Sequence, residues 1–241
     1  PRSNRIKRKL KRRWRAPCNR ARQQGAAALA RAGLVHAYGH CSARIDAGSF
    51  LVCAAGPMGL VGQRAGTVCP VVGPLPTGVL GEVRAHQAIY AQRPEVGGIC
   101  RIMPPAVMAL STQGITPRAR HGIGAFFAPE VPLWDDPGLL RDDVKALRLA
   151  QGLGERPAIV MRGNGAVVVG ETLQQAVTLS WFLEDAARVE ERVRAGGFDS
   201  EQGLLTANEA AQRNGFDGGV VERMWAYLTD ADRRGAYDGG R

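Results

Sequence analysis

The sequence lacks three patterns that would assign a chain to a class at once. No stretch approaches the roughly 18 consecutive apolar residues that a membrane-spanning helix needs, and the N-terminus has no apolar block of the secretory kind. The five cysteines contain no Cys-x-x-Cys spacing, which argues against a disulfide framework and against a zinc knuckle. We therefore expect a cytoplasmic protein with reduced thiols and no membrane partner.

Acidic residues are absent from the first 22 positions, which hold three lysines and eight arginines. The net charge of +10 belongs to this segment, and the rest of the chain is close to neutral. A basic block can bind phosphates or an acidic surface, but a charge block alone is a weak motif and also fits a solvated tail or a leader remnant. We expect residues 1–20 to be a disordered extension and no nucleic acid to bind elsewhere.

The remaining residues have the pattern of one layered α/β domain. With 241 residues, 45% of them hydrophobic, the chain can bury one substantial core. Strong helix formers over 21–32 end at Gly33, and a long amphipathic segment over 172–195 predicts a second helix. Two β-branched runs flank Gly163-Asn164-Gly165 and predict a hairpin, so the sheet should be largely antiparallel or mixed.

Two further segments place polar residues next to the predicted core. The spacing of Val83, His86 and Tyr90 predicts a helix that Pro94 ends, with Glu82 in its first turn. Segments 34–46 and 49–55 predict two short strands joined by a turn at 46–48. In the first of these strands, over 34–46, His36 and His40 would point to the same face.

Three blocks carry a family resemblance: GLVHAYGHCSAR at 33–44, GEVRAHQAIYAQRPEVGGICRIMPPAVMALS at 81–111, and AIVMRGNGAVVVGETLQQAVTLSWFLEDAARV at 158–189. In this order they resemble the class II aldolase/adducin family over roughly residues 21–193, in particular its decarboxylase-like branch. Members of that branch act on carboxylated hydroxypyridines, dihydroxybenzoates and carboxylated muconic semialdehydes. The resemblance implies a three-layer α/β/α domain with a central, mainly antiparallel sheet over 21–198, and a homo-oligomer, typically a tetramer. Beyond it, the stretch VVERMWAYL predicts a helical tail over 199–241 that packs on the domain.

The family's metal site is altered in this sequence. Members hold zinc or manganese on three histidines, two from a His-x-His-Pro-Pro segment and one from a His-Gly turn. Alignment on Pro104-Pro105 places Arg101 and Met103 at the first two positions, and alignment on GAVVVG places Asn164 at the third. None of the three suits such a metal, and strand alternation turns Cys100 to the opposite face. We therefore expect no metal and no other cofactor.

The resemblance also implies a set of site residues. Glu82 matches the family's catalytic glutamate. Arg101, with Asn164 as an amide donor, could hold a carboxylate or enolate oxygen while Glu82 protonates carbon. His121 is a candidate acid or substrate anchor, and the candidate substrate contacts are Gly39, His40, Ser42 and Gly56.

Each assignment has a structural alternative. Arg101 could simply neutralise Glu82 in an inactive site, Asn164 is a favoured turn residue, and Met103 could fill the core. His86 fits a structural role on its helix face. The leading hypothesis is a metal-independent carbon–carbon lyase, decarboxylase-like or aldolase-like, acting on a small anionic aromatic or dienoic acid. The alternatives are a non-catalytic module similar to the adducin head, and a biosynthetic cyclase or dehydratase that reuses the metal cavity.

Overall fold

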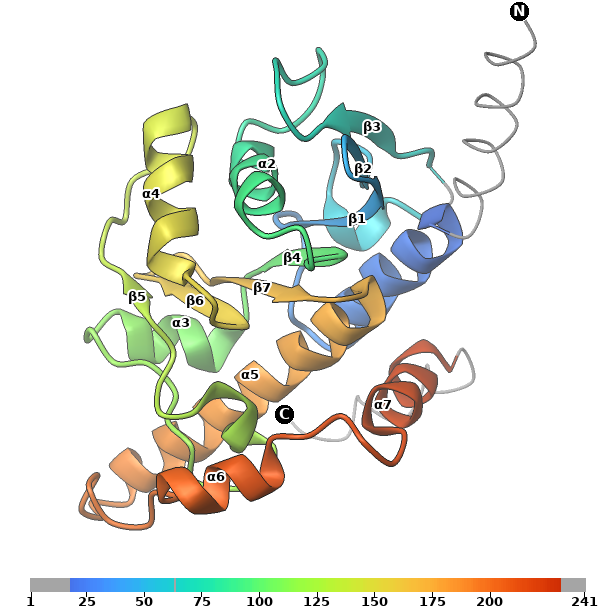
Figure 1. Ribbon diagram of the computed structural model, residues 1–241. Coiled ribbons are helices and arrows are strands. Elements are labelled where there is room, and N and C mark those ends of the chain that lie inside the picture. The colour runs from blue at the N-terminus through green and yellow to red at the C-terminus, as the bar shows by residue number, and fades with distance from the viewer. Residues whose placement is uncertain (1–17, 63, 231–241) are drawn as a thin grey trace, which may run out of the picture.

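The structure is a computed structural model that describes residues 18–62 and 64–230. It has three layers, with a central sheet between two sets of helices (Figure 1). Most of the predicted basic extension, residues 1–17, and the end of the tail, residues 231–241, lie outside the described residues. The three-layer architecture expected from the resemblance is confirmed.

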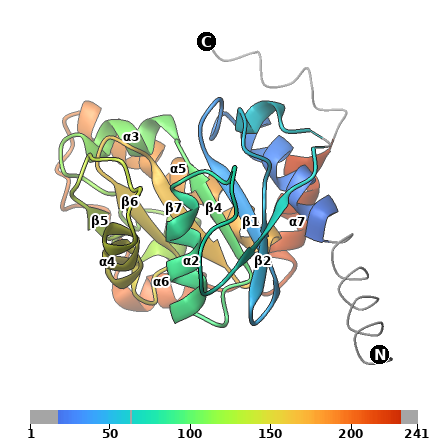
Figure 2. The ribbon, with the colours of Figure 1, turned by 90° about the horizontal axis from the view of Figure 1, so that it is seen from above.

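The sheet has seven strands in the order β3-β2-β1-β4-β7-β6-β5. Every pairing is antiparallel except β5 with β6, so the sheet is mainly antiparallel as expected. Figure 2 shows this order from β2 to β5. The strands are β1 (His40–Asp46), β2 (Ser49–Val52), β3 (Thr67–Pro70), β4 (Gly98–Ile102), β5 (Leu133–Trp134), β6 (Ala158–Met161) and β7 (Ala166–Gly170).

Helices cover both faces of the sheet. One face carries α2 and α4, which pack against each other, and the other carries α3, α5 and the helix over residues 18–31 (Figure 1). One face of α5, which includes Leu173, Val177 and Leu183, is buried, and this long helix crosses β1, β4 and β7. The bounds are α2 (Val83–Gln92), α3 (Pro105–Ser111), α4 (Asp143–Leu153), α5 (Leu173–Ala195), α6 (Ala207–Arg213) and α7 (Val220–Thr229), with 3-10 turns η1 (Met58–Leu60) and η2 (Gly124–Phe127).

The central strands β4 and β7 form the middle of the core. All five residues of β4 are buried, because α2 lies on one side of the sheet and α5 on the other. In the middle of α5 the buried Glu184 carboxylate accepts backbone hydrogen bonds from Ala106 and Val107, at 3.1 and 3.2 Å from Oε2. Glu184 therefore satisfies free backbone donors at the start of α3 and fixes the segment that follows β4.

One local prediction is wrong. His36 does not lie on a strand, because β1 begins only at His40 and residues 34–39 form an irregular segment. His36 is exposed and accepts a hydrogen bond from its neighbour's backbone, Ala37 N to His36 Nδ1 at 2.8 Å. Residues 32–38 form turns and bends between the helix over 18–31 and β1, so the side-chain alternation of a strand does not apply before Gly39. None of the helices in the described part of the chain is long and apolar enough to cross a membrane.

Candidate active site

A cavity of about 590 Å³ opens at the end of the sheet where β4 stops and β1 begins. This volume is in the range of pockets that hold small organic molecules. Its lining combines apolar side chains, among them Met103, Leu80 and Leu139, with charged ones. The charged lining residues are Glu82, Arg101 and Arg141, so the lining has an excess of positive charge and favours an anionic ligand.

The sheet register places two polar side chains next to each other in this cavity. His40 on β1 is directly opposite Arg101 on β4, and directly opposite residues of an antiparallel pair lie on the same face. Both side chains are almost fully buried, with His40 2% and Arg101 4% exposed. Cys100 lies opposite Cys41 one position away, on the other face of the sheet, as strand alternation predicts.

Arg101 and Glu82 form an ion pair across the cavity floor. Arg101 Nε lies 3.3 Å from Glu82 Oε2, and His40 Nε2 lies 4.0 Å from the same oxygen. Glu82 occupies the N-cap position of α2 rather than its first turn, and its side chain is 22% exposed toward the cavity. The three groups converge, and Glu82 is the one that solvent or a ligand can reach most easily.

Two donor atoms of this group have no hydrogen-bond acceptor among the described residues: His40 Nε2 and Arg101 Nε. The Nε–H of Arg101 is not aligned with the carboxylate, although the ion pair is close. Arg101 is held in place by its Nη1, which donates to the Ile102 carbonyl at 2.8 Å. Burial lowers the pKa of Arg101 from its ordinary value, and Glu82 opposes this shift. Unpaired buried donors beside an open cavity are suited to an anionic oxygen of a ligand.

The turn between β6 and β7 brings Asn164 into the cavity lining. Its backbone N–H donates to Met161 O at 2.9 Å, and Ser111 Oγ accepts from Gly163 N at 3.0 Å, so the turn is fixed against α3. Gly165 has φ +80°, and a Cβ there would collide with the Ile102 carbonyl and lie 3.0 Å from Arg101 Nη1. Only glycine lets this turn approach the arginine so closely.

Gly39 has a similar role at the start of β1. It has φ +110°, and a Cβ would lie only 2.8 Å from the Arg101 carbonyl oxygen. Gly39 and Gly56 both line the cavity, as predicted for substrate contacts. Glu82, Arg101, Asn164, Gly39, His40 and Gly56 are therefore brought together.

The structure does not bring Ser42 and His121 to this cavity. The Ser42 hydroxyl is buried behind His40, where it hydrogen bonds to His86 and Tyr90. His121 lies beside α5, with its Nε2 3.8 Å from Asp185 Oδ2. Strand alternation places Ser42 and His40 on the same face of β1, but it does not show that only His40 extends to the cavity while Ser42 stays beneath α2.

Arg101, Met103 and Asn164, at the positions of the family's histidines, form a poor donor set for zinc or manganese. A guanidinium carries a positive charge and has no lone pair to donate, a thioether is soft, and an amide oxygen is neutral. Within residues 18–62 and 64–230, no three His, Cys, Asp or Glu side chains are grouped to hold a metal ion. The residues present do not fit the family's metal.

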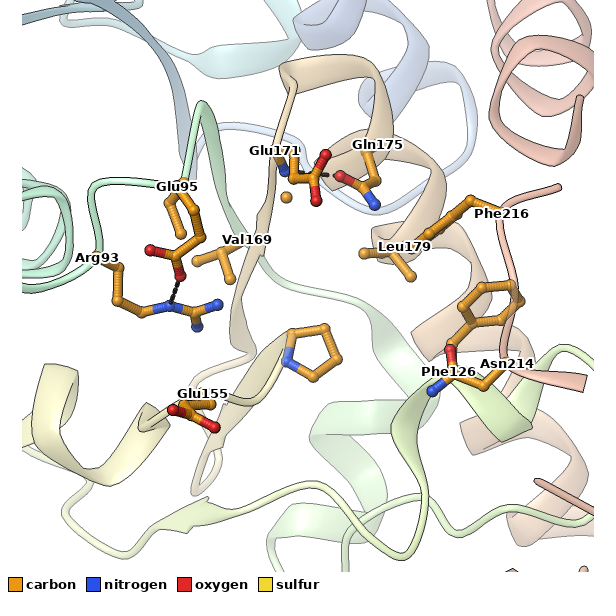
Figure 3. Close-up of a pocket in the computed structure, with 13 residues that line it drawn as sticks. Arg93, Glu95, Phe126, Glu155, Val169, Glu171, Gln175, Leu179, Asn214 and Phe216 are labelled. Atoms are coloured by element: carbon orange, nitrogen blue, oxygen red, sulfur yellow. Dashed lines mark hydrogen bonds and ion pairs between the residues drawn. The ribbon is translucent and has the colours of Figure 1, made fainter. Parts of the chain in front are cut away.

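A second, smaller cavity of about 230 Å³ lies at the opposite end of the sheet, where β7 ends (Figure 3). Its arginine, Arg93, already pairs with Glu95, Nε to Oε1 2.7 Å, and the Gln175 amide oxygen accepts from Glu171 N. Because its polar groups satisfy each other and Glu155 adds negative charge, it is a weaker candidate for an anionic ligand.

Comparison with known proteins identifies the family to which this fold belongs. The model of the Class II Aldolase and Adducin N-terminal domain matches residues 23–190. The chain belongs to this family. A 3,4-dihydroxyphthalate decarboxylase from Terrabacter sp. (strain DBF63) is 30% identical over 207 residues, which is 77% of this chain and 85% of the relative.

The similarity also extends to an adducin and to the solved structure of an aldolase. Human gamma-adducin is 29% identical over 114 residues, but these cover 46% of this chain and only 16% of adducin. An L-fuculose 1-phosphate aldolase from Glaciozyma antarctica PI12 superposes with a TM-score of 0.74 at 21% identity, covering 89% of both chains. The aldolase fold and the relatives named as decarboxylases support a lyase-type function.

Proposed function

We propose that this family member is a metal-independent carbon–carbon lyase that decarboxylates a small anionic aromatic or dienoic hydroxy acid. The observation that carries the proposal is the convergence of Arg101, Glu82 and His40 on a 590 Å³ cavity whose buried donors lack acceptors. The relative named 3,4-dihydroxyphthalate decarboxylase makes a hydroxylated aromatic carboxylate the first substrate class to test.

The residues support a balanced reaction on an acid whose hydroxyl is conjugated with the carboxylated carbon. Glu82 accepts the hydroxyl proton, and Arg101 holds the resulting oxyanion. Glu82 then returns the proton to the carboxylated carbon, while the oxyanion becomes a carbonyl. Cleavage of the carbon–carbon bond releases carbon dioxide, and its electron pair restores the oxyanion, which takes a proton from water. The net change is one proton taken up and one carbon dioxide released.

The cavity favours this reaction in two ways. Arg101 is a fixed cation with several N–H donors beside the place where charge returns to oxygen, and Asn164 can add an amide donor. The apolar part of the lining, which includes Met103 and Leu139, disfavours a charged carboxylate more than neutral carbon dioxide. Arg141 adds positive charge at the same cavity and is a candidate contact for a second carboxylate of the substrate.

A non-catalytic module is the second candidate, favoured by the Arg101–Glu82 ion pair and by the similarity to adducin. An inactive site would have no need for an open cavity or for buried donors without acceptors, so these features favour the enzyme. In both cases we propose a homo-oligomer, since Tyr38 and Leu139 at this cavity are 67% and 55% exposed apolar side chains that a second copy could cover.

Turnover of 3,4-dihydroxyphthalate and of simpler dihydroxybenzoates, followed as released carbon dioxide, tests the proposal. The wild-type chain should turn over at least one of them, and Glu82→Gln should lower kcat by roughly 10² to 10⁴ because it removes the proton carrier. Glu171→Gln, at the opposite cavity, is the matched control and should keep wild-type turnover. If neither variant differs from wild type, Glu82 is not the proton carrier. If no acid of this class reacts, the proposed substrate class is wrong.

A further inference from the structure

Beneath the cavity, four buried side chains form one continuous hydrogen-bond chain. His40 Nδ1 lies 2.9 Å from His86 Nε2, and His86 Nδ1 lies 2.7 Å from Ser42 Oγ. Ser42 Oγ in turn lies 2.9 Å from Tyr90 OH. His40 and Ser42 come from the same face of β1, and His86 and Tyr90 from one face of α2. Only the His40 end of the chain reaches the cavity.

The Tyr90 hydroxyl indicates the direction in which these hydrogen bonds run. Among the described residues, Ser42 Oγ is the only hydrogen-bond partner of the Tyr90 hydroxyl. If Tyr90 did not donate to Ser42, its buried proton would have no acceptor, at a cost of roughly 1–3 kcal/mol. Tyr90 therefore donates to Ser42, and Ser42 donates to His86 Nδ1. His86 must then carry its proton on Nε2 and donate it to His40 Nδ1, which leaves the proton of His40 on Nε2.

The cavity end favours the same direction. A proton on His40 Nε2 points toward the Glu82 carboxylate, whose Oε2 is 4.0 Å away, whereas a lone pair there would face a negative charge. The ring is also neutral. Burial lowers the pKa of His40 well below its usual range, and His86 and Arg101 lower it further. Burial, with Arg101, lowers the pKa of His86 to about 3.

We propose that neutral His40 is a second oxyanion donor, which presents its Nε2–H beside Arg101, and that Ser42, acting through His86, is the positioning residue that fixes this tautomer. The inference rests on the proposed function for the identity of the oxyanion. His40 Nε2 and Arg101 Nε lie 4.0 and 3.3 Å from the same oxygen, Glu82 Oε2, and neither makes an aligned hydrogen bond within the described part of the chain. A hydroxyl whose proton passes to Glu82 would become an oxyanion between them. A neutral imidazole can act as such a donor because its N–H is fixed in direction.

This arrangement also restricts the substrate class. Two N–H donors without acceptors favour an oxygen that carries a negative charge and has free lone pairs. The site should therefore select acids with a free hydroxyl next to the reacting carbon, and reject the corresponding methyl ethers, which cannot give up a proton to Glu82.

The tautomer can be measured without any substrate. The protein has four histidines, so a long-range ¹H–¹⁵N spectrum of the ¹⁵N-labelled protein at pH 7 can resolve each ring. In this spectrum we expect His40 and His86 to be neutral, with the proton on Nε2. The signals are assigned by their loss in His40→Gln and His86→Gln. A His40 ring protonated on Nδ1, or charged, would overturn the proposal whatever the protein's activity.

Two matched variants test the role of the chain. Ser42→Ala removes the donor to His86, so His40 should become a mixture of tautomers. Tyr90→Phe also deletes one hydrogen bond, but the Ser42 proton still has only His86 Nδ1 as an acceptor, so the His40 signal should stay that of the Nε2 tautomer. Equal spectra for the two variants would show that the hydrogen bond from Ser42 to His86 does not set the tautomer of His40.

The oxyanion role is tested with 4-nitrophenol, whose absorbance reports its ionisation. The wild-type chain should bind the phenolate, His40→Leu should weaken binding by roughly 10- to 100-fold, and His40→Gln should stay within about fivefold, because an amide N–H can replace the donor. Unchanged binding to His40→Leu, or equal losses in both variants, would refute the donor role. If the wild-type chain does not bind nitrophenolate, the proposed substrate class fails, while the spectrum still decides the tautomer.

Discussion

Replacing Arg101 by methionine separates its role in stability from its role in chemistry. At 3.3 Å and an effective dielectric constant near 20, the attraction between Arg101 and Glu82 is about 5 kcal/mol before desolvation is subtracted. Desolvation of the buried guanidinium offsets much of this. Because Glu82 is 22% exposed and can be hydrated, we expect Arg101→Met to lower the free energy of unfolding by about 1–3 kcal/mol.

The double variant distinguishes the two roles. Adding Glu82→Gln removes the unpaired carboxylate, so part of the lost stability should return, with a coupling energy of about 1–3 kcal/mol. Turnover should not return. Arg101→Met alone should lower kcat by roughly 10² to 10³, the usual loss when one oxyanion donor is removed.

Urea unfolding and turnover of the four members of this cycle are the required measurements. Arg84→Met is a suitable control, because Arg84 pairs on the surface with the 86% exposed Asp143 and should contribute less than about 1 kcal/mol. The reasoning is refuted if Arg101→Met keeps turnover within threefold of wild type, or if the coupling energy to Glu82 is zero.

Three further changes have defined outcomes. Asn164→Ala should lower kcat about tenfold or more while changing stability by under 1 kcal/mol, because Asn164 has no positive φ; wild-type turnover would exclude it as a donor. Glu190→Ala should cost about 3–5 kcal/mol in urea unfolding, since Glu190 is buried against Arg120, Nε to Oε2 2.6 Å. Burial raises the pKa of Glu190, but Arg120 and the other arginines outweigh burial and lower this pKa below 4.5. The stabilisation by Glu190 is therefore present above pH 4.5 and lost as the pH falls further. An equal loss of unfolding free energy in Glu190→Ala at pH 3 and at pH 7 would contradict this reasoning. Changing Arg101, Met103 and Asn164 together to histidine should create stoichiometric zinc binding, measurable by elemental analysis, and its absence would refute the alignment of these positions.

The elements that hold the site could be predicted because their signals are local. Pro104-Pro105 ends β4 just after Arg101, and Gly163-Asn164-Gly165 makes a tight turn between two β-branched runs. Each signal fits within about ten residues. The convergence of Arg101, Glu82 and Asn164 was then expected from the family resemblance, and the cavity lining agrees with it.

The series of hydrogen bonds from Tyr90 to His40 could not be predicted, although the spacing of its residues can be seen in the sequence. His86 and Tyr90 are four residues apart on a helix, and His40 and Ser42 two apart on a strand, so each pair shares a face. Nothing in the sequence says that this helix face lies on this strand face, because that contact depends on how the layers pack. His86 was expected to be structural for the same reason, and its hydrogen bonds now give it a position next to the site.

Long-range charges were missed in the same way. Glu184 lies on the buried face of α5 and accepts from the start of α3, about 78 residues earlier in the sequence. A buried glutamate in an amphipathic helix has no local signature that reveals its partner. Burial raises the pKa of Glu184, and the Ala106 and Val107 hydrogen bonds partly oppose this.

The central claim is that Arg101 and its neighbours carry out the chemistry without the family's metal. The most direct test is elemental analysis of the protein purified without chelator, combined with turnover before and after dialysis against EDTA. We predict less than one tenth of an equivalent of zinc or manganese, on the order of a trace contaminant, and unchanged turnover after dialysis. Stoichiometric metal, or turnover that disappears with EDTA and returns with zinc or manganese, would contradict the account.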